Sequence, residues 1–304
     1  MIAHANAILN ELMDQGYTLT LRQLYYQLVA RGTIANKMTE YKRLGSIIND
    51  ARLAGLVDWD AIEDRTRNLQ SVPHWKEPSD IIRSAAESFR LDKWLDQKYR
   101  IECWVEKDAL VGVLERACRD LDVAWFSCRG YTSQSELYGA GKRLSGYIYE
   151  RQTPIIIHLG DHDPSGKDMT RDIEERLCMF VGFPVRVERI ALNMDQVEEY
   201  NPPPNPAKVT DSRFYEYEKE FGDESWELDA LNPRVIHELV TDKVAEYRDE
   251  LKFAKQQEEE RVRRKALEDA SSNWQEVAAF LEVFEQEKQE EERQRAKQQQ
   301  EEEE

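Results

Sequence analysis

The stretch IIIHLGDHDPSG, residues 155–166, decides the fold of this chain. A short apolar run ends abruptly in a glycine and two aspartates, which is typical of a buried strand whose carboxyl end opens onto a binding site. A second stretch, IECWVEKD at residues 101–108, has the same layout and delivers Glu106 at its end. Ligand sites of parallel sheets lie beyond the carboxyl ends of the strands, so we expect both stretches to end at one crevice.

Apolar runs alternate with amphipathic stretches between residues 99 and 192. Strands are expected at 101–105, 124–128, 154–159 and 185–192, and helices at 109–121, 135–149 and 168–180. This alternation predicts an α/β fold with a mostly parallel, Rossmann-like sheet and helices on both faces. A proline-rich segment at 201–206 ends the alternation. We assign this domain, with a C-terminal extension, to residues 99–245.

The two strand ends carry three carboxylates, namely Glu106, Asp161 and Asp163. Residues two apart in extended chain face the same way, so both aspartates are expected to point into the crevice. Gly160 and Gly166 would allow the backbone to approach closely on either side. Three hard oxygen ligands suit Mg²⁺ better than zinc or calcium, and we therefore predict a magnesium site. A solvated turn is the alternative for the aspartate pair taken alone.

The first 72 residues are expected to form three helices and a wing. The helices are predicted at 3–15, 20–32 and 39–54, and Thr20 with Gln23 has the spacing of a capping box. Residues 56–59 and 65–67 resemble a short strand pair around a turn. This order is typical of a winged-helix DNA-binding module, and a small helical bundle without a ligand is the alternative.

The second of these helices carries a candidate nucleophile. Leu21, Leu24, Tyr25 and Leu28 follow helical spacing and define its core stripe, whereas Tyr26 falls off that stripe, one turn after Arg22. A guanidinium beside a phenol favours the phenolate and can clamp a phosphate, so Tyr26 is a candidate catalytic residue. An ordinary exposed surface pair is the alternative from geometry alone.

Two further segments complete the chain. Residues 73–98 are expected to form a linker and a helix over 80–95, and residues 246–304 a charged tail that is helical or disordered. In that tail, a short apolar stripe from Trp274 to Phe284 could dock on the body or on a partner. We assign the tail no chemistry.

Composition limits the function further. The formal charge of the 304 residues is -18, but residues 1–95 are neutral and the acidic excess lies beyond them, which lowers the expectation of tight, non-specific DNA binding. The four cysteines form no CxxC pair, which indicates reduced thiols in a cytoplasmic protein and no zinc site. No run approaches the roughly 18 apolar residues of a membrane span, so no membrane association is expected.

Three motifs in chain order carry a family resemblance. An Arg22-x-x-Tyr25-Tyr26 helix is followed by Val105-Glu-Lys-Asp-Ala109 and then by Asp161-x-Asp-Pro-x-Gly166. The last two resemble the Toprim domain of topoisomerases, primases and some nucleases. Together the three resemble the A subunit of topoisomerase VI and its meiotic double-strand-break relatives, over about residues 18–231. The chain looks like a minimal version, and its residues 227–231, ELDAL, are similar to a Glu-x-x-Ala-Leu segment of that family.

The resemblance implies a function. Tyr26, with Arg22 beside it, would attack a DNA phosphate and leave a 5′-phosphotyrosyl link, while Glu106 would also serve as general acid or base. In that family the tyrosine of one subunit works with the metal of the other, so a homodimer is implied. The glycine-rich segment GAGKR at 139–143 lacks the P-loop pattern, so ATP-driven strand passage would need a separate ATPase subunit.

Basic residues near these motifs are candidate DNA contacts. Lys42, Arg43 and Arg52 lie on the third helix at spacings that could face a groove, and Lys107 and Lys167 flank the acidic strand ends. For each of them an ion-paired or solvated surface position is the alternative.

Two other functions compete with the transesterase. The first is a Toprim nuclease in which metal-activated water cuts DNA and Tyr26 is structural. The second is a DNA-binding or assembly subunit without enzymatic activity, whose charged tail recruits a partner. A Tyr26→Phe variant separates the first two, because cleavage by water would persist in it.

Overall fold

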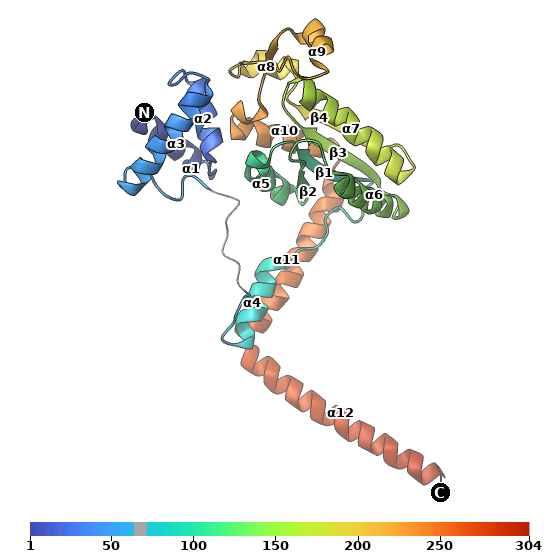
Figure 1. Ribbon diagram of the computed structural model, residues 1–304. Coiled ribbons are helices and arrows are strands. Elements are labelled where there is room, and N and C mark those ends of the chain that lie inside the picture. The colour runs from blue at the N-terminus through green and yellow to red at the C-terminus, as the bar shows by residue number, and fades with distance from the viewer. Residues whose placement is uncertain (64–71, 304) are drawn as a thin grey trace. The chain divides into compact units, whose positions relative to one another are not determined.

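The computed structural model describes residues 1–63 and 72–303, with side chains to residue 295 (Figure 1). The chain divides into two compact units. The first contains Met1–Asn68 together with Asp96–Asp249, and the second contains Leu69–Leu95 together with Glu250–Glu304. In the described part of the chain, no helix combines the length and the apolar character that crossing a membrane requires.

A four-stranded parallel sheet lies at the centre of the first unit, which confirms the predicted α/β fold. Its strand order is β2-β1-β3-β4, and every neighbouring pair is parallel. The strands are β1 (Tyr99–Val105), β2 (Ala124–Ser127), β3 (Thr153–Leu159) and β4 (Arg186–Ala191). Because β1 and β3 are neighbours, the two strands that precede the predicted acids end side by side.

Helices cover both faces of this sheet. On one face α6 (Gln134–Tyr149) packs beside α7 (Pro164–Val181), over a core that includes Trp104 and Ile156 (Figure 1). On the other, α5 (Val111–Leu121) packs beside α10 (Pro233–Ala245). A 3₁₀ turn, η1 (Asp108–Leu110), leads from the end of β1 into α5.

After β4 the chain makes an excursion of short elements that packs back against the sheet. It continues through α8 (Met194–Tyr200), β5 (Asn205–Pro206), α9 (Phe214–Phe221), β6 (Glu224–Ser225) and the 3₁₀ turn η2 (Leu228–Ala230). An antiparallel bridge between His162 and Trp226 fastens this excursion to the loop after β3. The excursion therefore returns residues 226–231 to the carboxyl edge of the sheet, before α10 begins.

Three helices form the N-terminal part of the first unit: α1 (Ile2–Asp14), α2 (Leu21–Ala30) and α3 (Met38–Leu53). The predicted capping box is confirmed, because the Thr20 side chain accepts from the Gln23 backbone and the Gln23 side chain accepts in return. The predicted strand at 56–59 is wrong, since Leu56, Val57 and Trp59 lie in bends, and Ile62 makes an isolated bridge to Leu19. Its expected partner, 65–67, lies outside the described residues.

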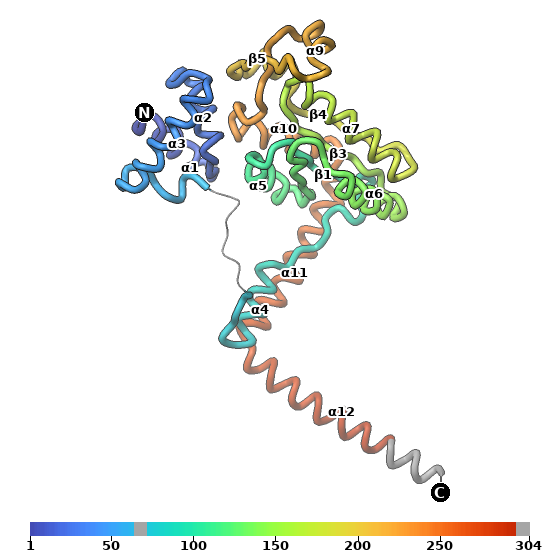
Figure 2. The backbone as a smooth tube through the Cα atoms, in the orientation of Figure 1, coloured from blue at the N-terminus to red at the C-terminus, as the bar shows by residue number. Residues whose placement is uncertain are grey.

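The second unit pairs two segments that are far apart in sequence. Helix α4 (Pro78–Ser88) lies alongside α11 (Glu250–Ser272), as both the ribbon and the tube show (Figure 2). Lys93 and Glu260 form a buried ion pair at 2.7 Å beneath this packing. The predicted helix over 80–95 ends early, at Ser88. The tail continues as α12 (Trp274–Glu303), on which Leu281 and Phe284 of the apolar stripe are exposed.

Candidate active site

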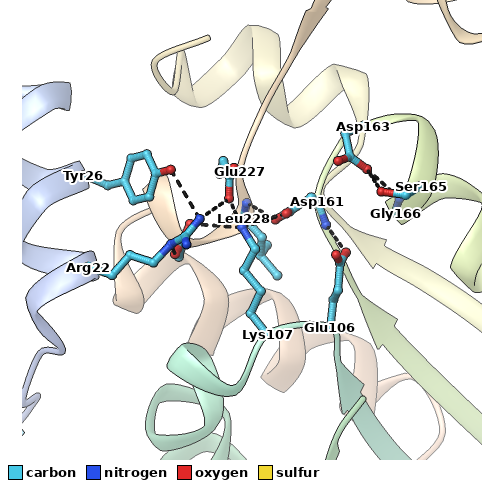
Figure 3. A network of polar contacts seen from close by, with 12 residues as sticks. Arg22, Tyr26, Glu106, Lys107, Asp161, Asp163, Ser165, Gly166, Glu227 and Leu228 are labelled. Carbon is cyan, nitrogen blue, oxygen red and sulfur yellow. Dashed lines mark hydrogen bonds and ion pairs between the residues drawn. The ribbon is translucent and has the colours of Figure 1, made fainter. Parts of the chain in front are cut away.

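The predicted acids lie at the carboxyl edge of the sheet. Glu106 directly follows β1, Asp161 lies two residues beyond β3, and Asp163 is the N-cap of α7 (Figure 3). The Asp161 backbone N–H donates to Glu106 Oε2 at 2.9 Å, so the two strand ends are joined by a hydrogen bond. The topology thus brings the three residues to one place, as the two stretches of sequence predict.

Two glycines make this close approach possible. A Cβ atom on Gly160 would lie 2.9 Å from Glu106 Oε2, and one on Gly166 would lie 3.0 Å from the same oxygen and overlap the Asp161 carbonyl. A side chain at either position would force the loop away from Glu106. The predicted role of both glycines is confirmed.

The carboxylates themselves fan apart. Asp161 Oδ2 pairs with Lys107 Nζ at 2.7 Å and Oδ1 accepts from the Leu228 N–H at 2.8 Å, whereas Asp163 Oδ1 accepts from the Gly166 N–H at 2.6 Å. Within residues 1–63 and 72–303, no group of three or more His, Cys, Asp or Glu side chains is arranged to hold a metal ion. The expectation that both aspartates point together into the crevice is therefore wrong for this arrangement, because α7 begins at Pro164, not at residue 168, and Asp163 caps it.

The negative charges of Glu106, Asp161 and Asp163 nevertheless suit a divalent cation. Burial, together with the negative charges of Asp161 and Asp163, raises the pKa of Glu106 to about 7. Burial also raises the pKa of Asp161, although Lys107 opposes that shift. Carboxylates that repel one another in a buried setting gain from a hard cation. Glu106, Asp161 and Asp163 are thus the residues that would hold magnesium after a change of side-chain rotamers.

The raised pKa of Glu106 predicts that magnesium binding depends on pH. Below about pH 7 a bound ion must displace a proton from Glu106, so affinity should rise with pH and level off above 7. Calorimetry at pH 6 in two buffers of different ionisation enthalpy should detect proton release, which Glu106→Gln removes. An affinity that does not change between pH 6 and 8 would contradict the assignment.

The raised pKa of Glu106 also determines how the free energy of unfolding changes with pH. The folded-state pKa of Glu106 lies above the unfolded value of about 4.3, so the folded chain binds more protons between these two pH values. The contribution of Glu106 to the free energy of unfolding is therefore fully present below about pH 4 and is lost as pH rises through 7. Without metal, Glu106→Gln should flatten this part of the stability profile.

Sequence reasoning missed one residue that shapes the site. Arg189, half-buried on β4, donates to the carbonyls of Gly160 and Gly166, both at 2.9 Å, and of Asp161 at 2.5 Å. It holds the loop after β3 in its tight conformation and places a positive charge behind the acids. The available signal was an arginine within the apolar run 185–192.

The candidate nucleophile is less exposed than the helical stripe predicts. Tyr26 is only 6 % exposed, because residues 228–231 pack against the face of α2 that was expected to be open. Its hydroxyl lies 3.5 Å from the nearest Arg22 nitrogen. Tyr26 and Arg22 line a cavity of about 360 Å³, and Asp163 and Glu227 line it as well. Tyr26 therefore borders the same cavity as Asp163, whereas Glu106 and Asp161 do not line it.

Arg22 does not by itself produce a phenolate. Burial raises the pKa of Tyr26, the negative charge of Asp229 adds to this, and the opposing effect of Arg22 is smaller. The expectation that the guanidinium shifts the phenol toward ionisation is outweighed in this state. A proton must therefore leave Tyr26 during any attack on phosphate.

Ion pairs connect the tyrosine helix to the acids. Arg22 Nε binds Asp229 Oδ2 and an Arg22 terminal nitrogen binds Glu227 Oε2, both at 2.9 Å. Lys107 Nζ contacts Glu227, Asp229 at 3.5 Å and Asp161 at 2.7 Å (Figure 3). All these residues belong to one chain. Sequence reasoning placed Glu227 and Asp229 in a motif but assigned them no role.

The five predicted DNA contacts differ in availability. Lys42 and Arg43 are exposed on α3. Arg52 instead donates to the carbonyls of Trp59, at 2.7 Å, and Ile62, and so ties α3 to the following loop. Lys107 is ion-paired as above, and Lys167 lies 4.1 Å from the centre of the Phe221 ring. DNA contacts by these last three would have to replace internal ones.

No protein-family model, curated protein or solved structure matched this chain.

Proposed function

We propose that this protein is a DNA-cleaving transesterase of the topoisomerase VI A-subunit type, with a winged-helix part that carries Tyr26 and a Toprim part that carries the acids. One observation carries the proposal. Tyr26 and Arg22 open onto the same cavity as Asp163, and Arg22 is linked through Glu227 and Lys107 to Asp161. A candidate nucleophile, a guanidinium and one of the proposed metal ligands therefore line one cavity, which supports an assignment to phosphoryl transfer.

The proposed reaction exchanges one phosphodiester bond for another. The Tyr26 oxygen forms a bond to the DNA phosphorus as the phenol gives its proton to solvent water, and the bond from phosphorus to the 3′-oxygen breaks. Arg22 is suited to bind a non-bridging phosphate oxygen. Glu106, with its pKa near 7, is suited to protonate the leaving 3′-oxygen and to take that proton back on resealing. Magnesium held at the three acids would supply charge neutralisation at the phosphate.

The proposal includes assembly and partners. A double-strand break requires two such sites, so the active species would be a homodimer on DNA. The exposed side chains of Lys42 and Arg43 on α3 support a contact with the DNA backbone. Strand passage, if it occurs, would depend on a separate ATPase subunit.

Hydrolytic cleavage is the second candidate, and a specific observation favours it. Tyr26 is almost fully buried and its pKa is raised, both of which disfavour it as a nucleophile. In a Toprim nuclease, water activated by the metal would attack instead, and Tyr26 would only pack against its neighbours.

A cleavage assay on supercoiled plasmid tests whether the protein cuts DNA and whether it needs magnesium to do so. With magnesium the wild-type protein should produce nicked and linear DNA, and a chelator should abolish both products, because the carboxylates alone leave the phosphate charge unneutralised. Cleavage that survives the chelator would contradict the metal assignment. DNA binding without cleavage under any divalent metal would instead favour the non-enzymatic subunit.

A further inference from the structure

One buried carboxylate lies between the two halves of the candidate site. The Asp229 side chain is completely buried, and each of its oxygens faces a different cation. Oδ2 accepts from Arg22 Nε at 2.9 Å, and Oδ1 lies 3.5 Å from Lys107 Nζ. Arg22 belongs to the tyrosine helix and Lys107 follows the strand that delivers Glu106. Asp229 therefore contacts both halves at once.

Each of the two cations that bind Asp229 also contacts a residue of the proposed reaction. Arg22 reaches the Tyr26 hydroxyl at 3.5 Å, and Lys107 pairs with Asp161 at 2.7 Å. The backbone of the same turn adds to the alignment, because the Leu228 N–H donates to Asp161 Oδ1 and the Leu231 carbonyl accepts from Gln27 on α2. A displacement of Asp229 would thus move Tyr26 and Asp161 relative to each other.

The buried carboxylate of Asp229 depends on both of its cationic partners. A buried carboxylate without its cations is unfavourable, so Asp229 stays buried only while both Arg22 and Lys107 remain in place. Replacing a buried ion-pair network by apolar side chains is often neutral for stability, so stability alone does not explain this network. The arrangement is therefore suited to positioning.

We propose that Asp229 is the positioning residue of this site, because it fixes the tyrosine helix α2 relative to Lys107 and the strand end that delivers the acids. The inference rests on the proposed function for its catalytic consequence. Glu227, whose carboxylate also contacts Arg22 and Lys107 but is a quarter exposed, supports the same alignment from the cavity side.

Asp229→Asn tests positioning directly, because the amide keeps the size but loses the charge. Glu102→Gln is the matched control: Glu102 is equally buried and pairs with Arg143 at 2.7 Å, but that pair touches neither half of the site. Asp229→Asn should lower the rate constant for cleavage about 100-fold with little change in the DNA concentration at half-maximal rate. Glu102→Gln should leave both unchanged once its folded fraction is accounted for.

Hydrogen exchange supplies a readout that does not depend on activity. In Asp229→Asn the amides of α2 should exchange at least about tenfold faster than in wild type, and in Glu102→Gln they should not. If Asp229→Asn fails to fold, Glu227→Gln should show the same faster exchange of the α2 amides and the same slower cleavage, both to a smaller degree. Unchanged α2 exchange in the folded variants would overturn the positioning role, even if the wild-type protein proved inactive on DNA.

Discussion

Replacing Tyr26 by phenylalanine is expected to lower the rate of DNA cleavage by about a thousandfold or more and to abolish covalent protein–DNA adducts. The variant removes the one oxygen that forms the bond to phosphorus and leaves the ring in its packed position. Loss of a nucleophile has effects of this order in enzymes that use covalent catalysis. Rates of plasmid cleavage under single-turnover conditions measure it.

Tyr25→Phe is the matched control. Tyr25 is the neighbouring residue, packs edge-on against Tyr26 and is equally buried, but its hydroxyl donates to the Asn36 side chain at 2.9 Å. Its loss should cost about 1 kcal/mol of stability and leave cleavage intact. Cleavage by Tyr26→Phe at the wild-type rate would make water the nucleophile and leave Tyr26 a packing residue.

Replacing Asp161 by asparagine is expected to have an effect of similar size by a different route. Asp161 lies at the end of β3, accepts from the Leu228 N–H and pairs with Lys107, and it is a proposed magnesium ligand. The amide removes one negative charge from the set and leaves a weaker ligand. We expect a loss of about a thousandfold in cleavage and a magnesium affinity at least tenfold weaker.

Asp168→Asn separates this effect from a general loss of acidity. Asp168 lies on α7, one turn beyond Asp163, and pairs with Arg213 at 2.7 Å, away from the strand ends. Its replacement should leave both magnesium affinity and cleavage unchanged. Isothermal titration with magnesium and plasmid assays on both variants provide the comparison. Equal magnesium affinity in Asp161→Asn and wild type would exclude Asp161 as a ligand.

Local patterns predicted much of this fold. The apolar runs before Glu106 and Asp161 predicted two parallel strands that end at one crevice, because burial on both faces leaves no alternation in sequence. The structure adds that these two strands are neighbours. The capping box at Thr20 and the glycines around Asp161 were also predictable, since each depends on residues within a few positions. The magnesium ligands and the DNA chemistry remain predictions.

The errors at Tyr26 and Lys107 have a common physical cause, which is contact between segments far apart in sequence. Tyr26 lies off the core stripe of α2, but residues 228–231 bury it from the other side. Lys107 was expected to contact DNA, whereas its partners include Glu227, 120 residues away. Helical periodicity reports which face of a helix is apolar, not how many elements pack on it.

End-labelled DNA tests the central claim most directly. A duplex labelled at the 3′ end of one strand, and in a parallel sample at its 5′ end, is cleaved with magnesium and denatured. Attack by Tyr26 predicts that the 3′ label stays on the protein, in a peptide containing Tyr26, and that the 5′ label is released with a free 3′-hydroxyl. Complete cleavage with neither label on the protein would contradict the account.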